Sequence, residues 1–382
     1  MEQPAAAPLS GMMASSGIRA AMSPGCREGR GDHVKVVVVG ATGNVGTAVI
    51  RALTADKSVS EILGIARRRP EWEPPKTSFV TADIARDDLV RHLRGADAVV
   101  HLAWLFQPTH RPMVTWQANA VGSARVFTAA SAAGVGALIY ASSVGAYSPG
   151  PGRRVDESWP THSVPTAAYG REKAYVERVL DAFEAQHRDI RVVRLRPAFI
   201  FQRQAATEQR RIFAGPLLPS ALLRPGRLPI LPWPTGLRFQ ALHANDVAEA
   251  YRLAVVGDGR GAYNVAADAV IDAASIGEVL GARVVSVPGR LAHVGLSAAW
   301  RLHLVPAEPW LLDLALQLPL LDTTRIRTEL GWSPTVSSLD ALREVLEGMA
   351  DHAGAQTPPL APDSMAGRLR EMATRVGERS TR

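Results

Sequence analysis

Short apolar runs alternate with longer amphipathic segments over the first half of the chain. Residues 34–39 are a β-branched run that ends at Gly40, which is typical of a strand buried on both faces of a parallel sheet. Similar runs predict strands over residues 61–65, 77–81, 98–102, 137–141 and 190–195. Helical periodicity is found between them, over residues 44–54, 87–94, 115–133 and 167–186. Strands that alternate with helices predict right-handed βαβ crossovers and a Rossmann-type α/β fold with a doubly wound parallel sheet.

The pattern changes after Pro197. Proline and leucine concentrate between residues 215 and 234, and helical periodicity returns near residues 245–256, 275–280, 294–302 and 339–349. We therefore expect a smaller, discontinuous substrate-binding region in the C-terminal half. The predicted organisation is a disordered leader over residues 1–32, a dinucleotide-binding domain over 33–197, a substrate-binding region over 198–350 and a flexible tail over 351–382. Residues 237–266 are expected to return in part to the first sheet.

Composition places the chain among ordinary globular proteins. Of its 382 residues, 47% are hydrophobic and 21% are charged, so a large core is expected. The single cysteine, Cys26, cannot form an internal disulfide, which favours a reducing compartment and a cytoplasmic location. The leader lacks the basic and apolar regions of a secretory signal. It is read as disordered or as sequence upstream of the true start, with a transit peptide as a lesser alternative.

Charge and hydropathy argue against two classes of partner. The net charge is +7, but the basic residues are scattered, so no nucleic-acid partner is expected. The best candidate for a membrane span, residues 310–321, is interrupted by Asp313, Gln317 and Pro319, so no membrane partner is expected. No spacing of histidines and carboxylates resembles a metal site.

A glycine motif follows the first predicted strand and opens the first predicted helix. Gly40 permits the tight turn, Gly43 allows the backbone to approach a pyrophosphate, and Gly46 lets the helix pack closely on the strand. The free N–H groups at the helix N-terminus favour phosphate there. With this flanking strand and helix, the motif favours dinucleotide binding over an ordinary glycine-rich turn. The predicted cofactor contacts from it are Gly40, Thr42, Gly43, Asn44, Val45 and Gly46.

The second predicted strand ends in arginines where an acidic residue would bind the adenosine ribose. Arg67 and Arg68 could pair with a 2′-phosphate, which favours NADP over NAD. A solvated arginine loop is the alternative. Asp83, followed by Ile84, comes after the third strand, where it could accept from adenine or cap a helix.

The strongest chemical signal is Tyr169 followed four residues later by Lys173. This spacing places both side chains on one helix face, so the ammonium is expected to lower the pKa of the phenol and to make it a proton donor or acceptor. An incidental surface pair is the alternative. Ser142 and Ser143 follow a strand at its carboxyl end, where ligands bind in open α/β sheets. We expect Ser143 to orient a substrate oxygen and Ser142 to contact the nicotinamide.

Together these motifs resemble the extended short-chain dehydrogenase/reductase proteins, the NAD-dependent epimerase/dehydratase group. The resemblance covers about residues 34–350. The residues that carry it are the glycine motif, Asp83 and Ile84, His101 to Ala103, Asn119 to Gly122, Ser142 and Ser143, Tyr169 with Lys173, Arg196 and Pro197, His243 to Ala248, Tyr263 to Val265, and Leu330 to Trp332.

The resemblance implies that Tyr169 exchanges a proton with the substrate while a hydride passes between nicotinamide and the same carbon. It implies that Lys173 also holds the nicotinamide ribose and that Asn119 supports the surroundings of Lys173. Further cofactor contacts are implied for Leu102, Ala103, Trp104 and Pro197. His243 and Asp246 are expected to be structural.

The chain departs from the pattern of nucleotide-sugar enzymes at two places. The segment after Pro197 is apolar where an asparagine is usual, and Phe239 stands where a diphosphate-binding arginine is usual. The resulting prediction is an NADP-preferring oxidoreductase that acts on a carbonyl or secondary alcohol of a fairly apolar small molecule. The substrate-contacting candidates are Trp104, Phe106, Ser143, Phe199 and Phe201. Alternatives are a sugar-nucleotide epimerase or dehydratase with retained NAD, and a non-catalytic NADP-sensing regulator. A homodimer is possible.

Overall fold

A computed structural model describes residues 33–106, 110–373 and 376. The predicted leader, residues 1–32, lies outside the described residues. Within the described part of the chain, no helix combines the length and apolar character that a bilayer-spanning segment requires.

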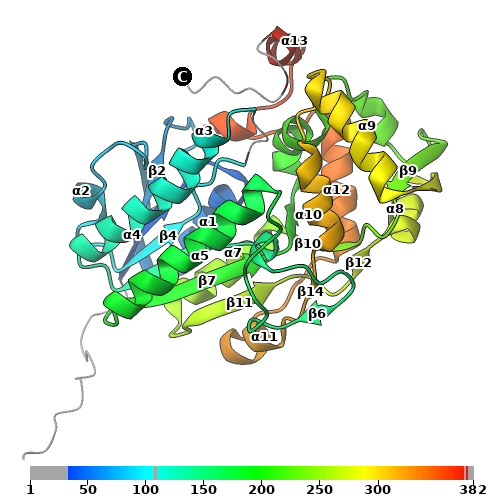
Figure 1. Ribbon diagram of the computed structural model, residues 1–382. Coiled ribbons are helices and arrows are strands. Elements are labelled where there is room, and N and C mark those ends of the chain that lie inside the picture. The colour runs from blue at the N-terminus through cyan, green and yellow to red at the C-terminus, as the bar shows by residue number, and fades with distance from the viewer. Residues whose placement is uncertain (1–32, 107–109, 374–375, 377–382) are drawn as a thin grey trace, which may run out of the picture. The chain divides into compact units, whose positions relative to one another are not determined.

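A seven-stranded sheet organises the first half of the chain (Figure 1). The strand order is β11-β7-β5-β4-β1-β2-β3, and every pairing is parallel. The strands are β1 Val34–Val39, β2 Val59–Ala66, β3 Thr77–Thr81, β4 Ala98–His101, β5 Ala137–Ala141, β7 Arg191–Pro197 and β11 Gly261–Val265. The direction of winding reverses between β1 and β4, so the loop after β1 opens into the crevice where such sheets bind ligands. The predicted Rossmann-type fold is confirmed.

Helices cover both faces of this sheet. One face carries α1 (Asn44–Ala55) and α7 (Ala244–Val256), which pack against each other, with α11 (Thr324–Leu330) beside α7. The other face carries α2 (Val90–Leu93), α4 (Gly122–Ala132) and α5 (Ala168–Gln186). Ile50, Leu53 and Tyr251 fill the first core, and Phe127 and Leu180 fill the second. These apolar layers fix the carboxyl ends of the strands that surround the crevice.

Two predicted helices differ from those observed. The helix expected over residues 87–94 contains only α2, because side-chain turns of Asp83, Asp87 and Asp88 occupy the preceding residues. The helix expected over residues 115–133 is α3 (Pro112–Trp116) and α4, joined by a π-helical turn, η1 (Gln117–Val121). Such turns are frequent at functional sites, and this one contains Asn119.

The C-terminal half builds a smaller region beside the carboxyl edge of the sheet (Figure 1). Its small sheets have the strand orders β12-β10-β8, β13-β9 and β14-β6. The strands are β6 Arg154–Val155, β8 Phe199–Phe201, β9 Ile230–Pro234, β10 Phe239–His243, β12 Val270–Ile271, β13 Arg283–Val287 and β14 Leu320–Leu321. Its helices are α6 Ala206–Gln209, α8 Ala273–Leu280, α9 Gly289–Arg301, α10 Pro309–Gln317 and α12 Ser338–Ala350. Its short helical turns are η3 Arg203–Ala205, η4 Arg210–Ala214 and η5 Ser220–Leu223, whereas η2 Val144–Ala146 follows β5 of the first sheet.

Part of residues 237–266 returns to the first sheet. Strand β11 becomes its edge strand against β7, and α7 packs on α1. Strand β10 instead pairs with β8 and β12. His243 caps α7 by accepting from the Asn245 N–H, and the Asp246 carboxylate accepts from the backbone N–H groups of Thr335 and Val336. Both residues therefore make the structural contacts expected of them.

Residues 351–373 differ from the flexible tail expected over 351–382. They form η6 (Pro358–Leu360) and α13 (Met365–Ala373), and Leu360 is fully buried. The buried guanidinium of Arg210 forms ion pairs with Asp363 and Glu371 in this segment. A buried charge requires such partners, so this segment completes the fold around Arg210.

Candidate active site

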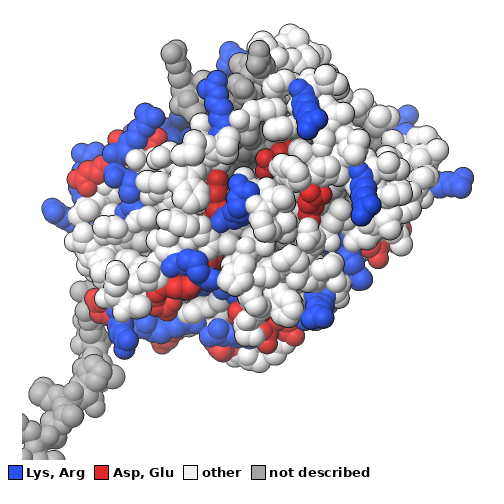
Figure 2. All heavy atoms as spheres, in the orientation of Figure 1, with Lys and Arg blue, Asp and Glu red and all other residues white. Residues whose placement is uncertain are grey.

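One cavity of about 470 Å³ opens at the carboxyl edge of the sheet. It begins at the glycine loop after β1, passes between the ends of β5 and β7, and continues under α9 and α10. The predicted residues that line it are Gly40, Gly43, Asn44, Val45, Gly46, Leu102, Trp104, Phe106, Ser142, Ser143, Tyr169, Lys173, Pro197, Phe199 and Phe201. Most of the residues proposed from the sequence therefore meet in one space. In the orientation of Figure 1, the surface is hollowed between the α3–α5 side and the α9–α10 side (Figure 2).

The glycine loop is shaped as a close backbone cradle. A Cβ on Gly40 would lie 2.5 Å from the Ala103 nitrogen, and one on Gly46 would lie 2.3 Å from the Gly40 oxygen. A Cβ on Gly43 would meet nothing closer than 3.7 Å. Gly40 and Gly46 thus serve packing within the loop, whereas Gly43 leaves open space above the N-terminus of α1. This arrangement fits a pyrophosphate against the free N–H groups of α1.

Neighbouring segments hold the loop in place. The Asn44 amide donates to the Ile200 oxygen, and Gln202 donates to both oxygens of Asn44. The Thr357 hydroxyl, from the C-terminal segment, donates to the Thr42 carbonyl at 2.8 Å. Gln202 and Thr357 were missed in the sequence, because no motif links them to a loop so distant along the chain.

Tyr169 lines the same cavity as the glycine loop and the phenylalanines of β8. Its phenol forms a hydrogen bond with Ser143, whose hydroxyl also accepts from the Gly145 N–H at 3.0 Å. The rings of Phe106 and Trp104 meet the Tyr169 ring edge to face, at centroid distances of 4.5 and 6.0 Å. Ser143 and Tyr169 therefore present two hydroxyls close together, beside the rings of Phe106 and Trp104.

The expected acidification of Tyr169 by Lys173 is wrong for this structure. Burial raises the pKa of Tyr169 to about 12, and the hydrogen bond from Ser143 offsets only part of that rise. The Lys173 ammonium lies 6.0 Å from the Tyr169 ring centroid and instead donates to the Ala141 carbonyl at 2.7 Å. Like a phenol at its usual pKa, Tyr169 therefore keeps its proton at neutral pH.

The Lys173 side chain is held by groups from the loop after β4, from β5 and from its own helix, α5. Its ammonium lies 3.5 Å from the ring centroid of Trp104, an attractive cation–π contact. Burial lowers the pKa of Lys173 well below its usual value, although the charges of Glu177 and Glu172 raise it. The ammonium carries three donors, of which one is used by the Ala141 carbonyl, and Lys173 also lines the cavity.

Asn119 acts on this site through its neighbours. Its amide donates to Glu172 at 2.7 Å, and its oxygen accepts from the Leu105 N–H at 2.7 Å. Thr115 donates to the other oxygen of Glu172 at 2.6 Å. Asn119 thus fixes both the loop after β4 and the residue next to Lys173. Glu172 was not singled out in the sequence, although its position beside Lys173 was a signal.

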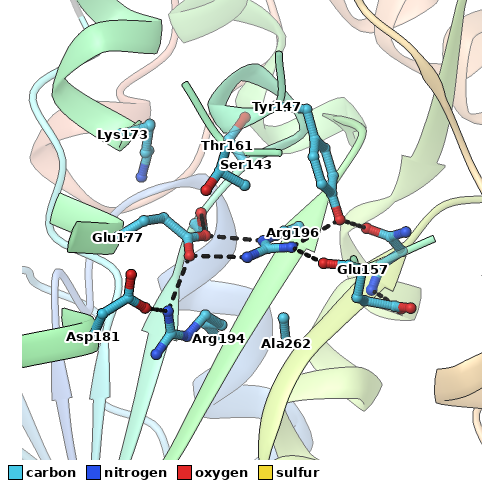
Figure 3. A network of polar contacts seen from close by, with 12 residues as sticks. Ser143, Tyr147, Glu157, Thr161, Lys173, Glu177, Asp181, Arg194, Arg196 and Ala262 are labelled. Atoms are coloured by element: carbon cyan, nitrogen blue, oxygen red, sulfur yellow. Dashed lines mark hydrogen bonds and ion pairs between the residues drawn. The ribbon is translucent and has the colours of Figure 1, made fainter. Parts of the chain in front are cut away.

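A buried ion network lies beneath the serines (Figure 3). Glu177 is fully buried and accepts from Arg196 at 2.9 and 3.0 Å, from Arg194 at 3.2 Å and from the Ser142 hydroxyl at 2.5 Å. Burial alone would raise the pKa of Glu177, but Arg196 and Arg194 bring it down to about 2. Arg196 also donates to the phenol oxygen of Tyr147 at 2.9 Å.

This network changes the role expected of Ser142. Its hydroxyl is committed to Glu177, so the side chain fastens the end of β5 to α5. The network itself was not predicted, although Glu177 follows Lys173 by the same four residues that separate Lys173 from Tyr169.

The far end of the cavity is apolar. Phe199 and Phe201 line it from β8, and Phe199 contacts Phe239 at a ring-centroid distance of 4.7 Å. Residues of α9 and α10 complete the wall, and the sequence analysis did not identify them: Leu296, Leu311, Leu312, Leu314, Ala315 and Leu318. Two carboxylates, Glu208 and Glu308, also line the cavity. Burial and the charge of Glu172 raise the pKa of Glu308, while Arg171 lowers it.

Six of the predicted cofactor residues lie outside the cavity lining: Thr42, Arg67, Arg68, Asp83, Ile84 and Ala103. Arg67 and Arg68 are exposed in the loop after β2. Partial burial lowers the pKa of Arg68, and the positive charges of Arg67 and Arg211 lower it further. Asp83 accepts from the Ala85 N–H at 2.9 Å in a side-chain turn; it is not a helix cap, because the next helix, α2, has Leu89 as its N-cap. Ile84 packs on Gly122, and the Ala103 backbone packs on Gly40.

Comparisons with known proteins agree on a family. The model of the NAD dependent epimerase/dehydratase family matches residues 36–266. An uncharacterised protein of Mycobacterium tuberculosis is 25% identical over 321 residues, which cover 81% of this chain. The chain spans only 29% of that relative's length. A dTDP-glucose 4,6-dehydratase of Streptomyces niveus is 26% identical over 362 residues, covering 87% of this chain and 98% of that enzyme.

The solved structure of a UDP-glucose 4-epimerase from Thermus thermophilus, in complex with NAD, is similar in fold. Its TM-score is 0.61 at 21% identity, and the match covers 83% of this chain and 99% of that one. At this identity the likeness shows a shared fold, so the substrate has to be inferred from the site of this chain.

Proposed function

Since this chain belongs to the NAD dependent epimerase/dehydratase family, we propose that it is an NADP-preferring oxidoreductase for a fairly apolar carbonyl or secondary alcohol. The observation that carries the proposal is the position of Tyr169 within a single cavity. One end of that cavity is the glycine cradle, and the other end is lined by phenylalanine and leucine. The hydroxyls of Tyr169 and Ser143 meet where the two ends join.

The residues at the first end fit a nicotinamide dinucleotide. Gly43 and the N-terminus of α1 would hold the pyrophosphate, Lys173 the nicotinamide ribose, and Pro197 would pack near the nicotinamide. The cofactor would supply the hydride. Glu177 fixes Ser142 and the guanidinium of Arg196 below this end, so the strand termini are rigid before a ligand arrives.

Tyr169 and Ser143 have different roles at the substrate oxygen. The Ser143 hydroxyl donates a hydrogen bond that orients a carbonyl, and the protonated Tyr169 donates its proton as negative charge develops on that oxygen. Phe106 and Trp104 exclude water from the phenol, which keeps both hydrogen bonds strong. A phenol that holds its proton at neutral pH can supply it to a carbonyl oxygen, so we propose carbonyl reduction as the direction.

The lining of the cavity favours an apolar substrate over a nucleotide sugar. Phe199 and Phe239 contact each other where a diphosphate would need donors, and the two carboxylates Glu208 and Glu308 would repel it. Similarity to a dTDP-glucose dehydratase keeps the sugar-nucleotide reaction as the second candidate. NAD that stays bound through purification would favour that candidate. A non-catalytic regulator is third, because the chain keeps both Tyr169 and Lys173.

We place the enzyme in the cytoplasm, because a chain with one cysteine gains no disulfide from an oxidising compartment. Purified protein, tested with NADPH and a panel of ketones and aldehydes of increasing apolar size, should consume NADPH by loss of its absorbance. Turnover only with UDP- or dTDP-sugars would reject the proposed substrate class.

Arg67 and Arg68 provide the test of cofactor preference. Each charge-assisted hydrogen bond to a phosphate contributes about 1.5–3 kcal/mol, so the double variant Arg67→Ala/Arg68→Ala should weaken NADPH binding by about 10- to 100-fold. NADH binding should hardly change. Isothermal titration with both cofactors measures this, and Arg188→Ala, an exposed arginine at the end of α5, is the control. Equal losses for NADPH and NADH would show that the arginines do not read the 2′-phosphate.

Substitutions of Gly43 and Gly46 should affect cofactor affinity and protein stability differently. Gly43→Ala adds a Cβ with no contact nearer than 3.7 Å, so the melting temperature should stay within a few degrees of wild type while NADPH affinity falls. Gly46→Ala places a Cβ 2.3 Å from the Gly40 oxygen, so both stability and binding should fall. Thermal melts with and without NADPH distinguish the two. A Gly43→Ala protein that binds NADPH normally would move the pyrophosphate away from this loop.

A further inference from the structure

Helix α9 has two opposite faces, and among the residues that the structure describes only one of these faces is packed against other elements. On the inner face Leu296 lines the cavity, His293 contacts Asp313 at 2.9 Å, and Trp300 stacks on His110 at a centroid distance of 3.9 Å. At 3.6 residues per turn, the opposite side presents Leu291, Val294 and Leu302 in one row. We call these three residues the α9 apolar face.

The α9 apolar face is open to solvent. Leu291 and Val294 are each 64% exposed and Leu302 is 68% exposed. A Cβ added at Gly295, in the same row, would meet nothing within 4 Å. Leu304, directly after the helix, is 44% exposed. Four large apolar side chains in one stretch of 14 residues (291–304) are more than scattered surface leucines, and they mark an interaction site.

Within α9 and the residues that follow it up to position 307, arginine is the only charged residue type. Residues 289–307 contain Arg290 and Arg301 and no aspartate or glutamate. Both arginines are exposed, and neither has an ion-pair partner within the described part of the chain. The surface over α9 is mostly uncharged, with basic side chains beside it (Figure 2). An apolar row flanked by arginines is typical of a helix that lies in a lipid interface.

The position of α9 relates this face to the cavity. The same helix that exposes Leu291 and Val294 outwards closes the cavity inwards through Leu296. If α9 lay on a lipid surface, this one helix would therefore separate an apolar compound in the lipid from the apolar end of the cavity. Membranes are the place where apolar compounds accumulate, so a docked enzyme would meet them at high local concentration.

We propose that the α9 apolar face, with Arg290 and Arg301, docks on an anionic lipid surface that supplies the apolar substrate. The statement that the lipid surface supplies the substrate rests on the proposed function, whereas the docking itself does not. This proposal departs from the sequence-based expectation of no membrane partner, which rested on the absence of a spanning segment. Interfacial binding needs no such segment.

Charge argues for lipid rather than a second copy of the chain. A two-fold contact through α9 would bring its arginines toward those of the partner helix, and residues 289–307 offer no carboxylate to compensate them. Anionic headgroups compensate them directly, since each basic residue near such a surface contributes attraction.

Flotation with lipid vesicles tests the docking. The full-length protein, without cofactor or substrate, should float with vesicles of phosphatidylcholine and phosphatidylglycerol, less with phosphatidylcholine alone, and less at high salt. Leu291→Ser/Val294→Ser should lower the bound fraction about tenfold, because the apolar anchor is lost. Arg290→Glu/Arg301→Glu should abolish the preference for anionic vesicles.

Matched controls keep the result interpretable. Val256→Ser, at an exposed valine on α7, and Arg188→Glu, at the end of α5, should float like wild type. Circular dichroism and NADPH binding show that each variant is folded. Tyr169→Phe should also float normally, so a failed reaction and a failed docking are distinguishable.

Two outcomes would overturn the proposal. One is a wild-type protein that stays in solution with anionic vesicles, or α9 variants that float equally well. The other is a wild-type protein that does not float with vesicles and forms a dimer in analytical ultracentrifugation. If Leu291→Ser/Val294→Ser dissociated that dimer, the α9 apolar face would be the contact with a second copy of the chain.

Discussion

Tyr169→Phe is expected to lower kcat by about 10²- to 10⁴-fold, the usual contribution of a positioned proton donor. The phenol is the group that meets Ser143 where the two ends of the cavity join, and its pKa of about 12 keeps it protonated at neutral pH. Phenylalanine keeps the ring contacts with Phe106 and Trp104, so the fold and NADPH affinity should be preserved. Steady-state turnover and NADPH titration measure the two effects separately.

Tyr175→Phe provides the control for this experiment. Tyr175 lies on the same helix, α5, but is 45% exposed and contacts Trp116 rather than the cavity. Its loss should leave turnover unchanged. If Tyr169→Phe retained full turnover on the best ketone, Tyr169 would have no catalytic role and the proton would have to come from elsewhere.

Glu177→Gln is expected to give the largest loss of stability, about 3–5 kcal/mol, because removing one partner of a buried ion pair leaves the other unpaired. Here two guanidinium groups, Arg194 and Arg196, lose their shared carboxylate, and the Ser142 hydroxyl loses its strongest acceptor. Urea unfolding measures the change in free energy.

Glu184→Gln is the matched control, since Glu184 also pairs with Arg194 but is 38% exposed. That change should cost about 0–1 kcal/mol, as for other surface pairs. A Glu177→Gln protein as stable as Glu184→Gln would show that Glu177 is not the centre of the network.

The same carboxylate predicts how stability depends on pH. The pKa of Glu177 is about 2 in the folded protein and about 4.3 in an unfolded chain. A lowered folded pKa contributes stability that is present above the unfolded value, roughly 3 kcal/mol here, and that is lost as pH falls from about 5 toward 2. Wild type should lose this contribution on acidification, and Glu177→Gln should lack that part of the pH dependence.

The sequence predicted the main sheet because its signals are local. The strands β1, β3 and β5 have the predicted bounds, since each is a short apolar run between polar or glycine-containing turns. The glycine loop and the Tyr169–Lys173 pair were also found, because their chemistry requires fixed spacings on one turn or one helix face.

The pKa values and ion pairs of the site depend on tertiary contacts, and the sequence alone did not predict them. Lys173 was expected to acidify Tyr169, but its ammonium is drawn to the Ala141 carbonyl and to the face of Trp104, and burial dominates the phenol. The network around Glu177 joins α5 to β7, and the closure of the glycine loop by Thr357 spans residues 42 to 357. No local pattern encodes contacts of that length.

The apolar end of the cavity shows a different limit. Residues 310–321 were weighed as a membrane span from hydropathy alone, but most of them form α10, whose leucines line the site. An apolar helix has the same composition whether it faces lipid, a core or a ligand, so only the fold identifies its partner.

The most direct measurement is a crystal structure of the protein with NADP⁺ bound. We expect the pyrophosphate over Gly43, the nicotinamide beside Pro197 and Tyr169, and the Lys173 ammonium on the nicotinamide ribose rather than only on the Ala141 carbonyl. A dinucleotide bound with its nicotinamide outside this cavity, or a Tyr169 hydroxyl turned away from the nicotinamide, would contradict it.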